Sequence, residues 1–249
     1  MLPHRRQAEA EASTTLTGQV LIRLREDLKA NRFKPDERLR FERMKQLYDV
    51  GTAPLREALS RLVEVGLVVQ LGQKGFRVAP ASLADLRDVI ETRRLLAVRA
   101  FVEAVIHGGD DWEGGIVAAF HQFSKAARRK PATSGERAIW EEHHTAFHQA
   151  LLAGCPNHLL LHLWTVVFDK AERYRRLALE VGDWSPDERG DHERLMEAAL
   201  ARKSEQAGEL LYRHIGTSAE RLMARLGPAL IAPIGEGRNK RRRTGRGAS

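Results

Sequence analysis

The sequence lacks the features that mark secreted and membrane proteins. Its 249 residues include a single cysteine, Cys155, so no disulfide can form within the chain and a reducing setting is expected. No stretch approaches the roughly 18 apolar residues of a membrane span. The opening residues, MLPHRRQAEAEASTT, have basic side chains but no apolar run behind them, which argues against a secretory signal. We therefore expect a cytoplasmic protein with no membrane partner.

The motifs of several common enzyme classes are missing as well. There is no GxSxG, and GQKG lacks the pattern of a phosphate-binding loop. The zinc-hydrolase motif HExxH is absent, because His144 is followed by Thr145 and HERLM (192–196) ends in Met where a second His is needed. Catalysis is therefore not expected.

Positive charge is in excess over negative charge, but it is distributed unevenly along the chain. Residues 1–80 hold 15 Lys and Arg against 10 Asp and Glu, residues 227–249 hold six against one, and residues 81–226 hold 20 against 22, within a net charge of +8. Basic ends around a mildly acidic centre indicate a polyanion as the partner of the ends. Solvated surface charge is the alternative explanation.

The first eighty residues have the pattern of a winged helix-turn-helix. Apolar positions predict helices at 17–31, 41–48 and 49–66, with a turn at 33–39. Two short β-rich runs, LVVQ and GFRVAP, flank LGQKG and predict a hairpin. The predicted apolar faces comprise Val20, Leu21, Leu24 and Leu28 in the first helix, and Leu55, Leu59, Leu62 and Val63 in the third. We assign residues 16–80 to this domain, after a flexible segment at 1–15.

Such a domain needs donors for bases and phosphates near the start of its third helix and on its wing. Thr52 and Arg56 are predicted on the exposed side of the third helix, Arg40 lies just before the second, and Lys74 lies at the hairpin tip. Each has a simpler explanation as a solvated or ion-paired residue. Their combined arrangement favours double-stranded DNA as the partner.

Beyond residue 81 the sequence predicts helices only. Breakers such as HGGD, RKPATSG and GDWSPDERG separate them. The predicted helices span 83–107, 111–129, 135–153, 157–180, 187–201 and 204–226. The fold class is therefore mainly α, with an antiparallel six-helix bundle over 81–227 after the winged domain. A basic tail at 228–249, with GRNKRRRTGRG, is expected to be disordered and to strengthen DNA binding at low salt.

Histidines are concentrated in HHTAFH (143–148). In a helix, His144 and His148 lie one turn apart on one face, whereas His143 points elsewhere and is expected to be exposed. His192 and His214 lie about eleven residues on either side of a turn near Lys203, so two antiparallel helices would place them at equal height. Four converging imidazoles predict a divalent metal site. Surface or core histidines without a metal are the alternative.

The N-terminal motifs carry a family resemblance. The first eighty residues resemble the DNA-binding domain of the GntR family of bacterial transcription regulators. The matching pattern is F.PDERL…Y.VG.APLREALSRLVEVGLV…QKGFRVAP. That family usually has a Ser–Arg pair where this chain has Gly51 and Thr52. The resemblance implies that Arg56 keeps a backbone or base contact. It also implies that Arg40 or Arg43 compensates for the missing arginine.

Residues after 80 resemble the FCD domain, the helical effector domain of the FadR subfamily, in its shorter VanR-like form. The matching features are Phe147–His148, His192, His214 and AGCPN, while His144 replaces the usual Asp. The chain also resembles the carbon-starvation-induced repressor group, with which it shares the motifs PDE.LR, PLREALS.LV and GGD.WE. The resemblance implies a homodimer that senses a small carboxylic acid with zinc or nickel. It also implies that Arg93 takes a carboxylate, although Ala97 replaces an acidic residue common in the family.

Arg173, in AERYRR, is a second candidate to bind the acid. Together these features predict a ligand-responsive DNA-binding regulator of transcription, and a repressor in particular. A metal-dependent hydrolase with an all-helical His cluster is the alternative from another class. A module whose basic tail binds nucleic acid nonspecifically is a third.

Overall fold

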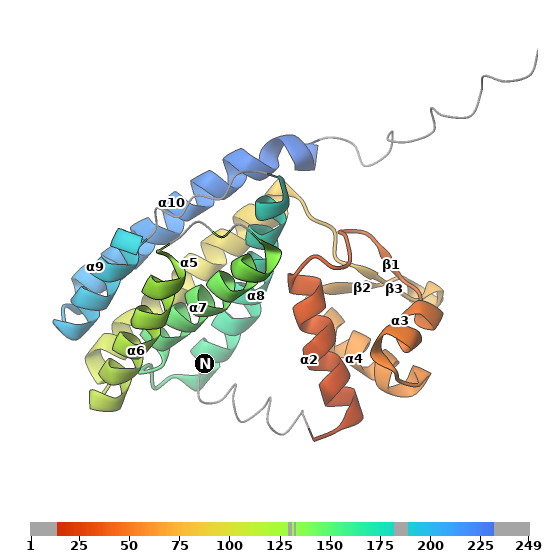
Figure 1. Cartoon of the computed structure of the whole chain (residues 1–249), viewed down its shortest axis with the longest axis horizontal. Coiled ribbons are helices and arrows are strands. Elements are labelled where there is room, and N and C mark those ends of the chain that lie inside the picture. Colours follow the sequence, from red (N-terminus) through yellow and green to blue (C-terminus); the bar gives the residue numbers. More distant parts are fainter. Residues whose placement is uncertain (1–13, 129–130, 132, 182–188, 232–249) are drawn as a thin grey trace, which may run out of the picture.

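The computed structural model describes residues 14–128, 131, 133–181 and 189–231. It consists of a small N-terminal domain with a three-stranded sheet and a larger all-helical domain, which lie side by side (Figure 1). This confirms the predicted fold class. None of the helices in these residues is both long and apolar enough to span a bilayer.

The N-terminal domain is a winged helix. Its helices are α2 (Leu16–Lys29), α3 (Phe41–Tyr48) and α4 (Thr52–Glu64), and its strands are β1 (Arg38–Leu39), β2 (Val68–Gln70) and β3 (Phe76–Val78). The Thr15 hydroxyl accepts a hydrogen bond from the Gly18 amide and caps α2. Leu24, Leu55 and Leu59, all inaccessible to solvent, join these helices in one core. The apolar stripes read from the sequence are thus the faces that pack together.

The wing is a short antiparallel sheet with strand order β1–β3–β2. Val68 pairs with Val78 and Gln70 with Phe76, and a 3₁₀ turn, η1 (Gly72–Lys74), joins the two strands. Gly72 and Gly75 have φ of 54° and 96°, which glycine adopts without strain. Strand β1 was not predicted, since two residues after a turn are too few to show an alternating pattern.

The second domain contains α5 (Leu83–His107), α6 (Asp110–Ala126), α7 (Ser134–Leu152), α8 (His158–Val181), α9 (Arg189–Leu200) and α10 (Ser204–Ile231). Side chains cap the helices at predicted breaks: Ser82 accepts from the Asp85 amide, and Thr133 forms a capping box with Glu136. Phe101, Phe147 and Trp164 lie in the shared core. The caps set where α5 and α7 begin.

The last helix differs from its prediction. Helix α10 runs to Ile231 and contains Pro228, whereas the sequence was expected to end the helix at 226 and begin a tail at 228. Proline has no backbone N–H and therefore cannot donate the usual helical hydrogen bond. Pro228 lies in the final turn, so only a few helical residues follow it, and its disruptive effect on the helix is small. The remainder of the expected tail, 232–249, and the expected flexible segment up to residue 13 lie outside the described residues.

Candidate metal centre and effector cavity

Four histidines converge inside the bundle. Helix α7 supplies His144 and His148, α9 supplies His192 and α10 supplies His214. All four are buried, and each offers a ring nitrogen within 4.8 Å of the others. The structure therefore brings together the four residues expected from the sequence. His143, half-buried rather than exposed as expected, stands outside this cluster.

The spacing of the nitrogens fits a metal. His148 Nε2 lies 3.2 Å from His144 Nε2 and 3.3 Å from His192 Nε2. Tetrahedral zinc, with Zn–N of roughly 2.0–2.1 Å, requires neighbouring nitrogens to be about 3.3 Å apart. Four imidazoles also form a donor set that suits zinc, copper, iron and nickel. The donor set and its spacing therefore fit the divalent metal that the FCD resemblance implies.

The protonation of the cluster also favours a metal. Burial lowers the pKa of His144 and His148 well below its ordinary value, and the charges of neighbouring histidines and arginines lower it further. Both rings are therefore neutral at neutral pH, with a lone pair available for coordination. No proton has to be displaced before they bind a cation.

The surroundings of the cluster hold the rings in place. His144 stacks on Trp140, with ring centroids 4.8 Å apart, and the Phe123 ring lies 4.6 Å from that of His192. His214 Nδ1 lies 3.9 Å from Asp191 Oδ2, and the proximity of His214 lowers the pKa of Asp191 to about 2. An anionic carboxylate behind a histidine orients its ring and raises its basicity toward a metal. Asp191 was not foreseen from the sequence.

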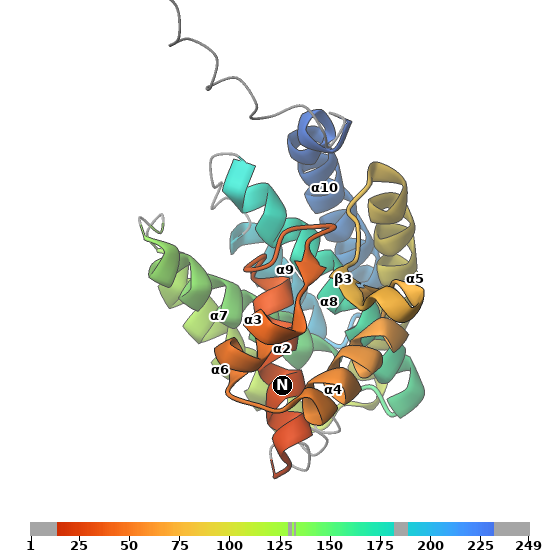
Figure 2. The same cartoon turned by 90° about the vertical axis from the view of Figure 1, so that its right-hand side faces the viewer.

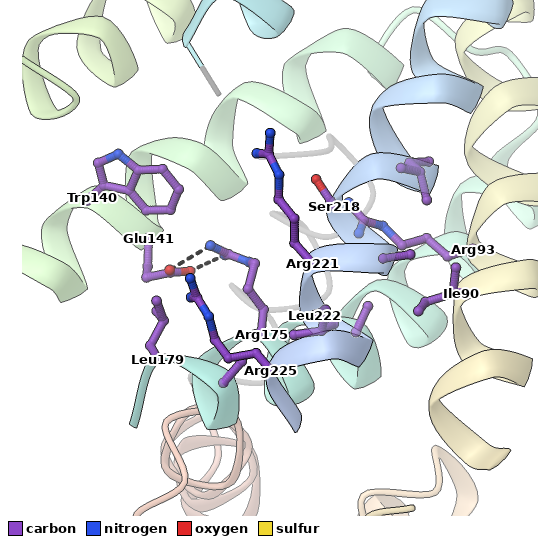
Figure 3. Close-up of a pocket in the computed structure, with 14 residues that line it drawn as sticks. Ile90, Arg93, Trp140, Glu141, Arg175, Leu179, Ser218, Arg221, Leu222 and Arg225 are labelled. Carbon is purple, nitrogen blue, oxygen red and sulfur yellow. Dashed lines mark hydrogen bonds and ion pairs between the residues drawn. The ribbon is translucent and has the colours of Figure 1, made fainter. Parts of the chain in front are cut away.

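A cavity of about 90 Å³ lies beside the cluster. A water molecule needs roughly 10–15 Å³ of such space, so the cavity can hold a molecule the size of a small organic acid. Trp140 connects the two sites, because it lines the cavity and stacks on His144. The residues around the cavity come from α5, α7, α8 and α10 (Figure 3).

The cavity lining is strongly cationic. Its charged residues are Arg93, Arg175, Arg221 and Arg225 against the single carboxylate of Glu141. Glu141 and Arg175 form the ion pair drawn in Figure 3, and Arg175 Nε also donates to Glu172 Oε1 at 3.0 Å. The Arg93 guanidinium lies 5.1 Å from the centre of the Phe168 ring. An excess of arginines in a partly apolar pocket selects for an anion.

Glu141 makes the charge of this cavity dependent on pH. Burial raises the pKa of Glu141 to about 7 against the opposing charge of Arg175. Glu172, which shares Arg175, behaves differently: burial alone would raise its pKa, but Arg175 and Lys29 hold it below the ordinary value. Arg175 thus has one permanent and one titratable carboxylate partner.

The structure does not place Arg173 in this cavity. Its buried guanidinium turns away and donates to the carbonyl oxygen of Ala79, in the segment between the domains. As an acid-binding residue, Arg173 therefore stays a prediction that this cavity does not support. On α8 the cavity-lining positions Ala171, Arg175 and Ala178 follow helical spacing, and Arg173 lies off that stripe.

Sequence reasoning also missed two arginines on α10. Arg221 and Arg225 follow His214 by seven and eleven residues, which is two and three helical turns. They therefore lie on the same side of the helix as His214, and both line the cavity, Arg221 as an exposed side chain and Arg225 as a half-buried one (Figure 3). Their helical spacing from His214 could have identified them from the sequence.

The DNA-binding candidates belong to the winged domain, whose elements α3, α4 and β3 lie in front of the bundle in Figure 2. Thr52 begins α4 and Arg56 lies one turn later, both exposed. The Arg56 guanidinium lies 5.2 Å from the centre of the Phe41 ring, at the start of α3. Arg40 and Lys74 are also exposed. These side chains remain available to a ligand.

Arg43 differs from the other DNA-binding candidates. Although it is exposed, Arg43 Nη1 donates to Glu37 Oε1 at 2.7 Å, and its guanidinium lies 5.5 Å from the centre of the Phe33 ring. It is thus engaged within its own domain. Of the two arginines expected to compensate for the missing family arginine, Arg40 is the more available.

Comparison with known proteins identifies the family of each domain. Residues 16–78 match the model of the bacterial regulatory proteins of the gntR family, and residues 88–217 match that of the FCD domain. The chain is 37% identical over 201 residues to the HTH-type transcriptional repressor GlaR of Escherichia coli (strain K12), covering 78% of this chain and 90% of GlaR. It is 35% identical to the HTH-type transcriptional regulator BphR of Paraburkholderia xenovorans (strain LB400), over 79% of this chain and 80% of BphR.

Among solved structures, E. coli McbR/YncC superposes with a TM-score of 0.72 at 20% identity, covering 84% of this chain and 98% of that one. This likeness shows the shared fold. The families and relatives are regulators of transcription rather than enzymes, so the comparisons do not support a hydrolase. FCD domains commonly bind a divalent metal and a small-molecule effector, in keeping with the buried histidines. The chain therefore belongs to the GntR family of bacterial transcription regulators, with an FCD domain behind its winged helix.

Proposed function

We propose that this regulator is a repressor whose FCD domain holds zinc or nickel on His144, His148, His192 and His214 and releases DNA when a small carboxylic acid enters the adjacent cavity. The observation that carries the proposal is the position of the four-histidine cluster beside a cavity with four arginines and one glutamate. Neutral ligands leave the full charge of a divalent cation, so both sites attract an anion. Arg93 is the residue proposed to take the carboxylate in a bidentate manner.

The residues of the chain contribute by binding and by positioning. A metal held on four neutral imidazoles would supply a positive charge at the cavity wall. Arg93 and Arg175 reach the cavity from two helices, α5 and α8, so an acid that contacts both changes the packing of one helix against the other. An effector shifts a conformational equilibrium only through such differential contacts.

The experiment that tests this function is a mobility shift on the DNA upstream of the gene, titrated with mono- and dicarboxylates, with and without prior chelation. We expect a salt-dependent, sequence-specific complex that an acid dissociates only when metal is present. A complex insensitive to every acid would overturn the sensing role. Loss of sequence preference would overturn the assignment of a specific operator.

Binding of the acid is expected to strengthen as the pH falls from 8 to 6. Glu141, with a pKa of about 7, is ionised at the upper limit and competes for Arg175, but is neutral at the lower limit. Asp191 stays ionised over this range because its pKa is about 2, and His144 and His148 stay neutral because burial lowers their pKa well below its ordinary value. Isothermal titration should show a gain of about tenfold. In Glu141→Gln the affinity should not vary with pH, and an unchanged wild-type affinity would contradict the assignment.

We also propose that the protein is a homodimer whose two winged domains read half-sites about one helical turn apart. The packed helices α5 and α8 expose large apolar side chains, including Leu95, Leu159 and Leu163, at 74%, 66% and 46% exposure. Leu95→Glu should shift the protein to a monomer in sedimentation equilibrium, since a charge there opposes apolar contact. The control, Leu16→Glu on α2, should remain dimeric, and a dimeric Leu95→Glu would exclude this surface.

A further inference from the structure

A second cavity, of about 220 Å³, lies where the two domains meet. Its walls come from Gly66 and β2 of the winged domain, from the segment 79–85 that leads from β3 into α5, and from α8 of the bundle (Figure 1). A water molecule needs roughly 10–15 Å³ of such space, so the cavity can hold a small organic or inorganic ion. None of the residues that line it also lines the effector cavity, so the two are separate spaces.

Arg173 brings a buried positive charge to this second cavity. It is 5% exposed, and within the described residues its guanidinium makes one hydrogen bond, from Nη2 to the Ala79 carbonyl oxygen, and no ion pair with a carboxylate. Burial lowers the pKa of Arg173 more than the neighbouring acidic groups raise it, yet a guanidinium stays protonated at neutral pH. The cation is therefore removed from water without a counter-ion, although buried charges in proteins are normally paired.

Lys170 adds a second cation one turn before Arg173 on the same side of α8. Its side chain reaches the winged domain, where a Cβ on Gly66 would lie 2.7 Å from Lys170 Nζ. The absence of a side chain at Gly66 thus leaves space for the ammonium group. In the part of the chain that the structure describes, Lys170 has no ion-pair partner either. Two like charges at this spacing repel each other, and an anion between them would offset that repulsion.

The acidic group at this cavity is already engaged. Asp85 is the one carboxylate among the described lining residues, and its Oδ2 accepts a hydrogen bond from the Tyr174 hydroxyl at 2.7 Å. The same Tyr174 oxygen accepts from the Ser82 backbone amide at 3.1 Å. Asp85 forms no ion pair with Lys170 or Arg173, so the described lining keeps an excess of positive charge.

We propose that this cavity is a second anion site, in which the carboxylate or phosphate group of a small molecule binds between Lys170 Nζ and the Arg173 guanidinium. A guanidinium presents a planar set of N–H donors to such a group, and the ammonium adds a point charge on a flexible stem. The bound group would lie beside the winged domain, because Lys170 reaches Gly66 and the Asn31 side-chain amide, just after α2, donates to the Arg173 carbonyl oxygen at 3.3 Å. Its occupancy should therefore stabilise the present arrangement of the two domains. The site requires neither the metal nor the acid of the effector cavity and goes beyond the proposed function.

Inorganic phosphate and succinate are the probes that distinguish the two chemistries. Each would be titrated calorimetrically into the full-length wild type, Lys170→Met and Arg221→Met, a control that removes an equal charge from the effector cavity. We expect at least one probe to bind the wild type and Lys170→Met to weaken that binding by about tenfold or more, because a charge-assisted hydrogen bond is lost. Arg221→Met should bind the same probe as the wild type does. If every binding step is weakened by Arg221→Met and left intact by Lys170→Met, the anion belongs to the effector cavity and the second site is rejected.

Hydrogen exchange measured by mass spectrometry locates the bound anion. In the wild type the probe that binds should slow exchange in 66–69 and 79–85 by several-fold relative to α6, and in Lys170→Met it should not. Slowing confined to other segments, equal slowing in Lys170→Met, or no binding of either probe would overturn the proposal. Lys170→Met loses no ion pair and should melt at the wild-type temperature; if it unfolds, Lys170→Gln replaces it. Because no DNA is used, a mobility shift without an acid response would reject the proposed function without deciding this result.

Discussion

The His148→Ala variant is expected to be isolated without a divalent metal and to bind operator DNA without responding to any carboxylic acid. His148 is the central ligand candidate, because its Nε2 lies within 3.3 Å of the Nε2 atoms of both His144 and His192. Loss of partners that merely support metal ligands lowers metal affinity by roughly 10–100-fold, so loss of a ligand should lower it by more than about 100-fold. Metal content by mass spectrometry and chelator competition would measure the effect.

The neighbouring His143 provides a matched control. His143→Ala removes an imidazole from the same helix, but from outside the cluster, and should leave metal content and acid response at wild-type values. The winged domain has its own core, so operator affinity without acid should change by less than about twofold in either variant. Full metal occupancy in His148→Ala, or equal loss in His143→Ala, would refute the four-histidine centre.

Much of the cluster could be predicted because helical geometry is local. The predicted turn near Lys203 is present: α9 ends at Leu200, α10 begins at Ser204, and Arg202 adopts the left-handed conformation with φ of 56°. Residues equidistant from a turn between antiparallel helices lie at equal height. The ring centroids of His192 and His214 are accordingly 4.6 Å apart. The distances of His192 and His214 from the turn were therefore sufficient to predict their contact.

The cavity was harder to predict because it depends on the rotation of each helix. Arg173 and Arg175 are only two positions apart in AERYRR, yet one reaches Ala79 between the domains and the other reaches Glu141 inside the bundle. Two positions turn a helix by about 200°, so a small error in phase exchanges the two roles. Glu141 and Asp191 act through partners on other helices. Such partners are defined only when the helices pack.

The Arg56→Ala variant is expected to bind its operator about 10–100-fold more weakly, the loss typical of one base or phosphate contact in such a complex. Arg56 is exposed in the second turn of α4, four residues after Thr52, so both reach the same side of the helix start. Its guanidinium is held over Phe41, which limits the freedom that it loses on binding. Fluorescence anisotropy with a labelled operator and with unrelated DNA would measure both affinities.

Two variants on the same domain separate a specific contact from a general loss of charge. Arg61→Ala removes an equal charge from the same helix, but Arg61 is paired with Glu57 near the other end of α4, so we expect less than about a twofold change. Arg40→Ala tests the residue proposed to replace the missing family arginine. If Arg40 reads a base, its loss should weaken operator more than unrelated DNA, whereas a phosphate contact would weaken both equally and reduce the salt dependence. Equal affinities for Arg56→Ala and Arg61→Ala would contradict the assignment of α4 as the recognition helix, since charge alone would then explain binding.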